Sequence, residues 1–348
     1  MANTLQNLIP SAYAALDVVS REQVGFIPSV TRDATVSRAA IGQTVYSHIV
    51  PQAAAIDIVP STTAPDSGDQ VIGAVGITIT KSRAVPIRWA GEETLGLNNG
   101  GITQQRIYQD QLVQAMRTLT NEIEADIAKM HVYASRANGY AGATPFSNAG
   151  DYTDASFTRE ILAANGAPVS GPTSLVLNTY AGANLRGMQA GYIYQGDPAF
   201  LRQGVLHDIS GMMVRESGQV VTAQAGDAMN ATTDSAGYAV GATTIHLSAT
   251  GSGSILAGDV VMFADDINKY VVAVGGSAAG GTIVLAAPGL RKAIPAGSSV
   301  GVEVIPTSVR NMAFTQDAIV LAQRLPALPP GGDMAVDRTT ITDPRSGL

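Results

Sequence analysis

The side chains of this sequence that could do chemistry are few, and they are not grouped. The four histidines, His48, His131, His207 and His246, lie far apart, and none belongs to an HxH or HExxH pattern or to a carboxylate-rich neighbourhood. Zinc sites draw their ligands from short, fixed spacings of this kind, so we expect structural or surface roles for these histidines. The sequence has no cysteine, which excludes disulfides, thiolate metal sites and cysteine nucleophiles and fits a reducing compartment.

Adjacent carboxylates occur at Asp265 and Asp266, between two predicted strands. They could bind a cation, although the tip of a hairpin is the more ordinary interpretation. Together with Glu303 they could also serve a β-rich, glycan-acting enzyme, but no acid pair has a convincing context. The sequence contains no GxGxxG or P-loop pattern, and the Gly-rich residues 275–281 precede a strand instead of a helix. No GxSxG nucleophile elbow is expected either, because the match at residues 297–301 leads into a predicted strand. We therefore expect no catalytic, cofactor or metal site.

The most informative element is a long amphipathic helix predicted over residues 103–136, a stretch without proline or glycine. At 1.5 Å per residue it would be roughly 50 Å long, longer than a small domain is wide. Its apolar positions recur at steps of three and four and form one face: Leu112, Met116, Leu119, Ile123, Ile127 and Met130.

Two extended regions precede this helix. Residues 1–50 form an N-terminal arm, and residues 51–101 form an extended loop with strands expected at 56–59 and 71–80 around a turn at 62–69. A lone hairpin is marginal in water, so it should rest on a partner. The candidate intersubunit contacts are Pro65, Asp66, Lys81, Arg83, Arg88, Glu92, Glu93, Asp265 and Asp266. The basic and acidic residues around position 85 could equally form a solvated edge that prevents aggregation.

The rest of the chain divides into three parts. A central (axial) part at 139–211 has helices expected at 156–165 and 180–190 and a buried strand at 174–178. Residues 212–308 hold many short strands separated by turn clusters, which indicates an inserted all-β sandwich or small barrel. Residues 309–348 return to the main domain with one strand at 318–322. The fold class is thus α+β.

Composition favours an assembly. Of 348 residues only 14% are charged, against about 25% in typical domains, and such a surface is easier to keep soluble when other subunits cover it. The net charge is −7, and no basic cluster occurs, so strong nucleic-acid binding is not expected. No apolar run is long enough to span a membrane, and the N-terminus lacks the pattern of a signal peptide. We expect synthesis in a cytoplasm.

The order of these regions, with local echoes at residues 244–250, 256–263 and 311–320, resembles the major capsid (coat) proteins of tailed bacteriophages. The closest similarity is to the podovirus type that carries an inserted β-barrel. The resemblance implies an arm and loop that reach adjacent subunits, a spine helix in the peripheral domain, and an insertion that stabilises the monomer. Chains of that family normally continue past the point matching Leu348, so either the chain is shortened or processed, or the closing strands come from elsewhere.

The function that follows is self-assembly into an icosahedral capsid shell enclosing a phage genome, with no enzymatic activity and no cofactor. Implied partners are copies of the chain in hexamers and pentamers, a scaffolding protein, a portal, and packaged double-stranded DNA through weak, non-specific contact. No membrane partner is expected. The protein would reside in the virion after assembly in the host cytoplasm. The alternatives are an encapsulin-like or surface-layer shell subunit and the glycan-acting enzyme.

Overall fold

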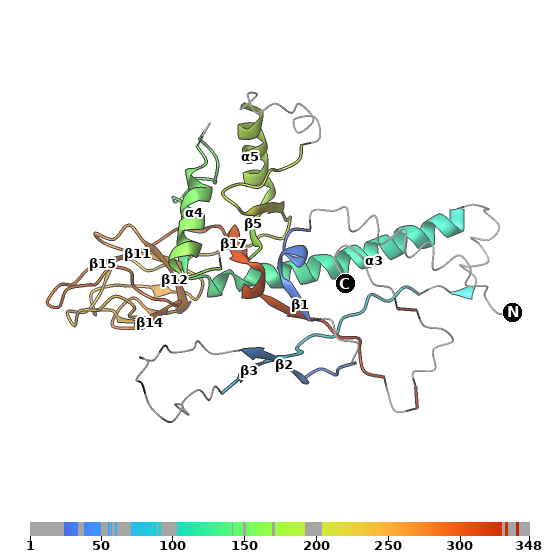
Figure 1. Ribbon diagram of the computed structural model, residues 1–348, viewed down its shortest axis with the longest axis horizontal. Coiled ribbons are helices and arrows are strands. Elements are labelled where there is room, and N and C mark those ends of the chain that lie inside the picture. The colour runs from blue at the N-terminus through green and yellow to red at the C-terminus, as the bar shows by residue number, and fades with distance from the viewer. Residues whose placement is uncertain are drawn as a thin grey trace.

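The computed structural model describes residues 24–33, 38–49, 71–88, 103–140, 142–148, 151–168, 171–191 and 204–328, with short pieces at 55, 57, 60, 90–91, 331–332 and 339–340. It is an α+β structure arranged along one long helix, α3 (Thr103–Ala128), with an all-β region at one end of that helix (Figure 1). None of the described helices is both long enough and apolar enough to cross a bilayer.

The spine helix α3 ends before the predicted residue 136. After Ala128 the backbone tightens into a 3₁₀ turn, η3 (Lys129–Tyr133), and then extends into β4 (Arg136–Ala137). Valine, tyrosine and histidine are moderate helix formers, and β4 pairs with strand β12 of the all-β region. Tertiary pairing therefore overrides the helical pattern over its last eight residues, about two turns.

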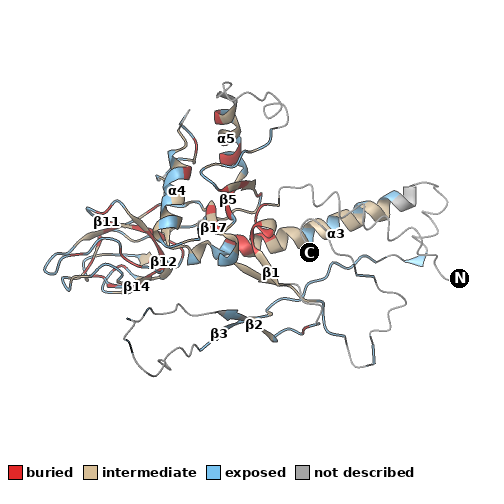
Figure 2. Cartoon of the chain, in the orientation of Figure 1, coloured by how far each residue is buried: buried red, intermediate tan, exposed pale blue. Residues whose placement is uncertain are grey.

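The apolar face of α3 is covered at one end only. Ile127 and Ala128 are buried in a core with residues far away in the sequence, whereas Leu112, Met116 and Leu119 stay half-buried. Figure 2 shows buried residues where this end of α3 adjoins β5 and β17. The described part of the chain leaves the other half of the predicted face without a full cover.

A three-stranded sheet packs on this buried end. Its order is β17 (Met312–Thr315), β5 (Thr173–Leu177) and β6 (Met213–Glu216), with all five residues of β5 buried. Strands β5 and β6 are parallel and are joined through α5 (Thr179–Gly191), as a crossover connection requires. Helix α4 (Thr153–Ala164) packs beside β17.

This sheet differs from the sequence prediction in two ways. The strand expected at the start of the insertion, now β6, pairs with β5 of the central sheet. Strand β17 was not expected from the sequence. A short 3₁₀ turn, η5 (Gln316–Ala318), separates it from β18 (Val320–Ala322), so the strand expected at 318–322 begins two residues later.

The all-β region is one curled antiparallel sheet around a core that includes Phe263, Tyr270 and Ile283. Its strands, in spatial order, are β8 (Ala231–Thr232), β15 (Gly301–Val304), β11 (Val260–Phe263), β12 (Lys269–Val274), β14 (Thr282–Leu285) and β9 (Thr244–His246). Beyond the two end strands, an isolated antiparallel bridge joins Thr233 to Leu247. Two small pairs flank the sheet, β10 (Ser254–Ile255) with β13 (Gly276–Ser277) and β7 (Thr222–Ala223) with β16 (Ser308–Val309).

Two further strand pairs lie along the spine helix. The N-terminal segment forms a 3₁₀ turn, η2 (Ile27–Ser29), and then β1 (Thr31–Asp33), which pairs in parallel with β18. An antiparallel hairpin joins β2 (Thr44–Ile49) to β3 (Gly73–Thr78). The strand predicted at 71–80 is therefore present, but its partner is β2 and not residues 56–59, most of which lie outside the described residues.

Candidate functional site

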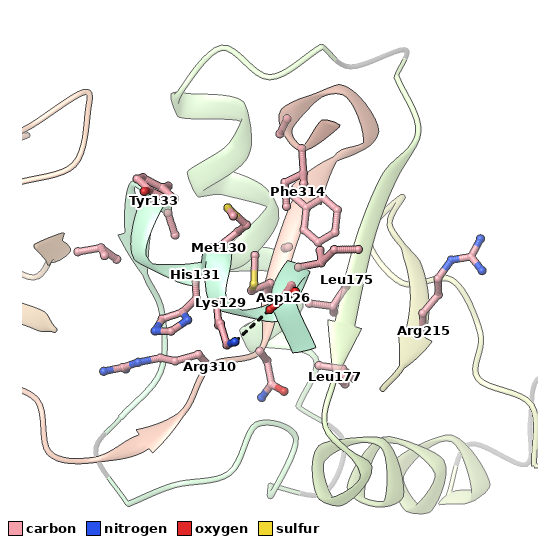
Figure 3. A pocket seen from close by; sticks show the side chains of 18 of the residues that line it. Asp126, Lys129, Met130, His131, Tyr133, Leu175, Leu177, Arg215, Arg310 and Phe314 are labelled. Atoms are coloured by element: carbon pink, nitrogen blue, oxygen red, sulfur yellow. Dashed lines mark hydrogen bonds and ion pairs between the residues drawn. The ribbon is translucent and has the colours of Figure 1, made fainter. Parts of the chain in front are cut away.

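A long groove of about 2590 Å³ runs between the hairpin, the spine helix and the sheet that ends with β17. The hairpin contributes Val75 and Ile77, and the helix contributes Met116 and Leu119. These four apolar residues come from two elements with little cover, and charged side chains of the same two elements, among them Lys81 and Asp126, also line the groove. Figure 3 shows the part of the groove around the end of the spine helix.

Ion pairs attach the hairpin to the helix across this groove. Lys81 Nζ lies 2.5 Å from Asp126 Oδ2 and 3.4 Å from Glu122 Oε1, and Arg83 Nε lies 2.9 Å from Glu122 Oε2. Hydrogen bonding to Asp126 raises the pKa of Lys81, and the bond from Arg83 lowers the pKa of Glu122. All four side chains are solvent-accessible, and exposed pairs of this kind contribute little to stability. They position the hairpin but do not anchor it firmly.

The predicted contact residues are thus placed only in part. Lys81 and Arg83 pair with the acidic side chains of the spine helix in the same chain, and Arg88 is exposed. Their expected counterparts Glu92 and Glu93, and the tip residues Pro65 and Asp66, lie outside the described residues. A role for any of these seven residues between subunits stays a prediction.

The adjacent carboxylates at the β11–β12 turn separate into two roles. Asp265 is exposed and has a φ of 64°, as turn residues with short polar side chains often do. Asp266 is buried, and its carboxylate accepts hydrogen bonds from Tyr270 Oη (2.7 Å), Asn268 N (3.0 Å) and Asn268 Nδ2 (2.7 Å). These bonds occupy Asp266 inside the turn, which agrees with the hairpin-tip interpretation.

Neither the metal nor the glycan-acting interpretation finds a constellation in the described part of the chain. No group of three histidines or carboxylates there is close enough to hold a metal ion. Glu303 lines a shallow hollow of about 510 Å³ on the sheet, and neither Asp265 nor Asp266 lines it. Glu303 therefore does not share this hollow with Asp265 or Asp266.

The residue with the most demanding environment was not predicted from the sequence. Glu124 of α3 is only 1% exposed. Its Oε2 accepts hydrogen bonds from Gly25 N (3.3 Å), Phe26 N (3.1 Å) and Ser217 Oγ (2.7 Å), and its Oε1 accepts one from Ile27 N (2.7 Å). A buried carboxylate is tolerated only when hydrogen bonds replace its hydration, and here four donors do so.

Glu124 joins three segments that are distant in the sequence. It fixes the turn at residues 25–27 and the end of β6 onto the spine helix, beside Phe26 and Phe314, whose rings stack at 6.4 Å between centroids. One signal in the sequence could have indicated this role. Glu124 lies directly beside Ile123 and three residues before Ile127, at the margin of the apolar face where a charge is unexpected.

The turn after the helix carries a second unusual pair. His131, on η3, is half-buried, and desolvation lowers its pKa, with a smaller contribution from the charge of Arg310. Burial also lowers the pKa of Arg310, and Asp259 opposes that shift. Figure 3 shows His131 and Arg310 close together at the junction of the spine helix and the all-β region. Such a site holds the imidazole neutral and offers it no carboxylate that would make it a general base.

No family model matches this sequence, and no curated protein matches it. Among solved structures, the chain is similar to one from Mycobacterium phage Che8, with 14% identity, 82% of this chain and 86% of that chain covered, and a TM-score of 0.39. A chain of the capsid of Cyanophage P-SCSP1u is 12% identical, with 85% and 87% covered and a TM-score of 0.39. A chain of a virus-like particle from Pyrococcus furiosus is 10% identical, with 84% and 93% covered and a TM-score of 0.30. At these TM-scores, function has to be argued from the contacts of the chain itself.

Proposed function

We propose that this chain is the repeating subunit of an icosahedral protein shell of the tailed-phage capsid type. The observation that carries the proposal is the exposure of the hairpin segment, which we define as residues 71–88. No residue of this segment is buried, and only Ile77 and Ile79 are half-buried. Its exposed residues include large aliphatic side chains: Val71 is 86% exposed, and Ile72 and Val75 are also exposed. A surface that holds this much aliphatic area in water is typical of an interaction site.

The hairpin segment cannot owe its conformation to its own chain alone. A two-stranded hairpin is marginally stable at best in water, and the ion pairs of Lys81 and Arg83 are exposed, so solvent screening leaves them little stabilising effect. Copies of the chain that cover the segment would supply the missing burial. Repetition over a lattice would then stabilise many weak contacts together, because association stabilises the folded state by mass action.

The spine helix supports the same proposal. Its residues Leu112, Met116 and Leu119 are only half-buried, although they share one face with the buried Ile127. A neighbour lying along this half of the helix would add apolar area toward the ~800 Å² that each partner contributes to a standard interface.

The finer features of the proposal follow the sequence resemblance. The order of the elements and the curled sheet support a podovirus-type subunit in which residues 212–308 form an inserted β-barrel domain. Hexamers and pentamers would build the shell, with a scaffolding protein and a portal as partners. With a net charge of −7, contact with packaged double-stranded DNA would be weak and non-specific. The protein would reside in the virion.

The test is assembly of the purified full chain across a concentration series, followed by sedimentation and negative-stain electron microscopy. We expect rings or closed shells above a threshold concentration, and loss of particles after deletion of residues 61–68 with the subunit still folded by circular dichroism. Shells that enclose a cargo protein in place of DNA in the producing cell would instead indicate the encapsulin-like alternative. A monomer at every concentration would overturn the proposal.

A further inference from the structure

Two asparagines where α4 meets the segment after the spine helix are each followed by a glycine. The pair Asn138–Gly139 follows β4, and the pair Asn165–Gly166 ends α4. Both asparagines are exposed, and the glycines have φ angles of 111° and 81° with no atom within 4 Å of an added Cβ. An asparagine before glycine is prone to react with its own backbone, because no side chain shields the next nitrogen. A third such pair, at residues 99–100, lies outside the described residues.

The reaction is an intramolecular displacement at the asparagine side chain. The backbone nitrogen of the following glycine attacks the side-chain Cγ, and the bond from Cγ to Nδ2 breaks. Nδ2 takes up the proton that the backbone nitrogen loses and leaves as ammonia, so a five-membered succinimide remains. Water then opens one of the two carbonyl–nitrogen bonds of this ring and yields aspartate or isoaspartate. The chain and water are the only reactants.

The backbone nitrogen of Gly166 is held away from this reaction by the end of α4. Gly166 N donates to the backbone oxygen of Ala163 (3.0 Å), and Ala167 N donates to that of Leu162 (3.0 Å). Together these bonds form the Schellman pattern that closes many helices. Both must open before Gly166 N can approach the side chain of Asn165.

The backbone nitrogen of Gly139 has no such restraint. Within the described part of the chain it donates no hydrogen bond, because the pairing of β4 with β12 ends two residues earlier, at Ala137 opposite Lys269. The two asparagine side chains are otherwise matched, with one hydrogen bond each. Asn138 Nδ2 donates to the backbone oxygen of Asp154 (3.2 Å), and Asn165 Nδ2 donates to Ser135 Oγ (2.6 Å). The two sites therefore differ mainly in the freedom of the attacking nitrogen.

We propose that Asn138 is a site of spontaneous deamidation and that Asn165, in the same dipeptide on the facing segment, is protected by the end of α4. Asn138 and Gly139 line the groove, so the reaction adds a negative charge to a surface that the proposed function uses. The net charge of the chain changes from −7 to −8, because a neutral amide becomes a carboxylate. The reaction itself does not depend on shell assembly.

The product also alters the contact between α4 and residues 135–138. A carboxylate at position 138 has no proton to donate to the oxygen of Asp154, which keeps its bond from Thr158 Oγ1 (2.7 Å). A carboxylate at position 165 could still accept a hydrogen bond from the hydroxyl of Ser135. Deamidation of Asn138 thus removes one of the two side-chain bonds between these segments, whereas deamidation of Asn165 would preserve the other.

The test follows both sites in the full-length subunit, kept unassembled at mildly alkaline pH and body temperature. Tandem mass spectrometry of tryptic peptides locates the deamidated residues over time, and a protein isoaspartyl methyltransferase identifies isoaspartate. We expect Asn138 to convert about tenfold faster than Asn165, because the two backbone hydrogen bonds that must open lower the reactive population by about that factor. Equal rates at the two sites in the folded subunit, or a faster reaction at Asn165, would overturn the proposal.

Two controls separate the fold from the local sequence. In concentrated urea the two rates should become similar, and a tenfold difference that persisted there would show that α4 does not protect Asn165. The second control uses chains with Asn99→Gln, so that residues 99–100 do not contribute. In that background Asn138→Gln, whose longer side chain would have to close a six-membered ring, should abolish most of the acidic form seen by ion exchange, whereas Asn165→Gln should leave it. An acidic form that survives Asn138→Gln would refute the assignment.

Discussion

Replacing Glu124 by glutamine tests whether one buried carboxylate holds the N-terminal segment on the spine helix. The variant Glu124→Gln keeps the shape of the side chain and one acceptor oxygen. That oxygen should take the position of Oε2, because three of the four donors, Gly25 N, Phe26 N and Ser217 Oγ, bind there. The new amide group would then face Ile27 N, a donor against a donor.

The expected loss of stability follows from the number of hydrogen bonds that the substitution changes. One buried donor left without its acceptor costs about 1–3 kcal/mol, and the remaining three bonds weaken because a neutral acceptor replaces a charged one. We therefore expect the free energy of unfolding to fall by about 2–4 kcal/mol. Glu124→Ala would remove all four bonds and cost more than about 4 kcal/mol, which is a large share of the 5–15 kcal/mol that stabilises a typical protein.

The assay is urea unfolding of the unassembled subunit, with amide hydrogen exchange at residues 25–27. The matched control is Glu122→Gln, two residues away on the same helix, whose ion pairs are exposed and screened by solvent, so its loss should change the unfolding midpoint little. Ser217→Ala should be non-additive with Glu124→Gln, since the two side chains share one bond. Equal unfolding midpoints for the two glutamine variants, with unchanged exchange at Phe26 and Ile27, would refute the reasoning.

Three further predictions concern other parts of the chain. Gly226→Ala should destabilise the all-β region by more than about 2 kcal/mol, because the new Cβ would collide with the carbonyl oxygen of Ser254. Gly187→Ala, at an open position within helix α5, should instead stabilise the protein by about 0.5–1 kcal/mol, and thermal melts of both variants check this. Tyr270→Phe should cost about 2 kcal/mol, since Asp266 loses a donor and Arg291 N loses its acceptor, and a melt within 1 °C of wild type would contradict it. Burial lowers the pKa of His131, so below about pH 6.5 the unfolded state binds a proton that the folded state does not bind, and stability falls as pH falls. In His131→Leu the urea midpoint should therefore change less between about pH 7 and 5.5 than in the unaltered chain. An equal change of the midpoint in both proteins would count against His131 as the titrating group.

Local periodicity predicted the elements whose stability is local. The start of α3 at Thr103 and strands such as β12 and β14 agree with the sequence, because a period of 3.6 or 2 is written into consecutive residues. The partner of β3 could not be read in the same way. Nothing in residues 71–80 distinguishes β2 from residues 56–59, since both are short β-prone segments and the choice depends on where the whole chain runs.

The site was less predictable than the fold because burial is a property of the tertiary structure. The pattern on α3 identifies one apolar face, but it does not say that Ile127 is covered and Leu112 is not. Glu124 and Asp266 show the same limit for charges. Glu124 is buried because backbone amides of a distant segment converge on it, and Asp266 is buried because its own turn brings Asn268 and Tyr270 onto it.

The distribution of burial along α3 connects these observations to assembly. Near its C-terminal end, Ile127 and Ala128 pack into a core shared with η2, β5 and β17, and Glu124 ties the N-terminal segment to the same place. Arg324, whose side chain is only 4% exposed, adds an ion pair to Asp33 that fixes the adjacent β1–β18 pair. Folding of the subunit thus depends mainly on one end of the helix, because neither the hairpin segment nor residues 106–119 of the helix contain a fully buried residue. A substitution such as Val71→Ser should therefore change assembly without changing the unfolding of the subunit, whereas Glu124→Gln should act first on unfolding. If both substitutions shifted the unfolding midpoint equally, folding and assembly would not depend on separate parts of the subunit.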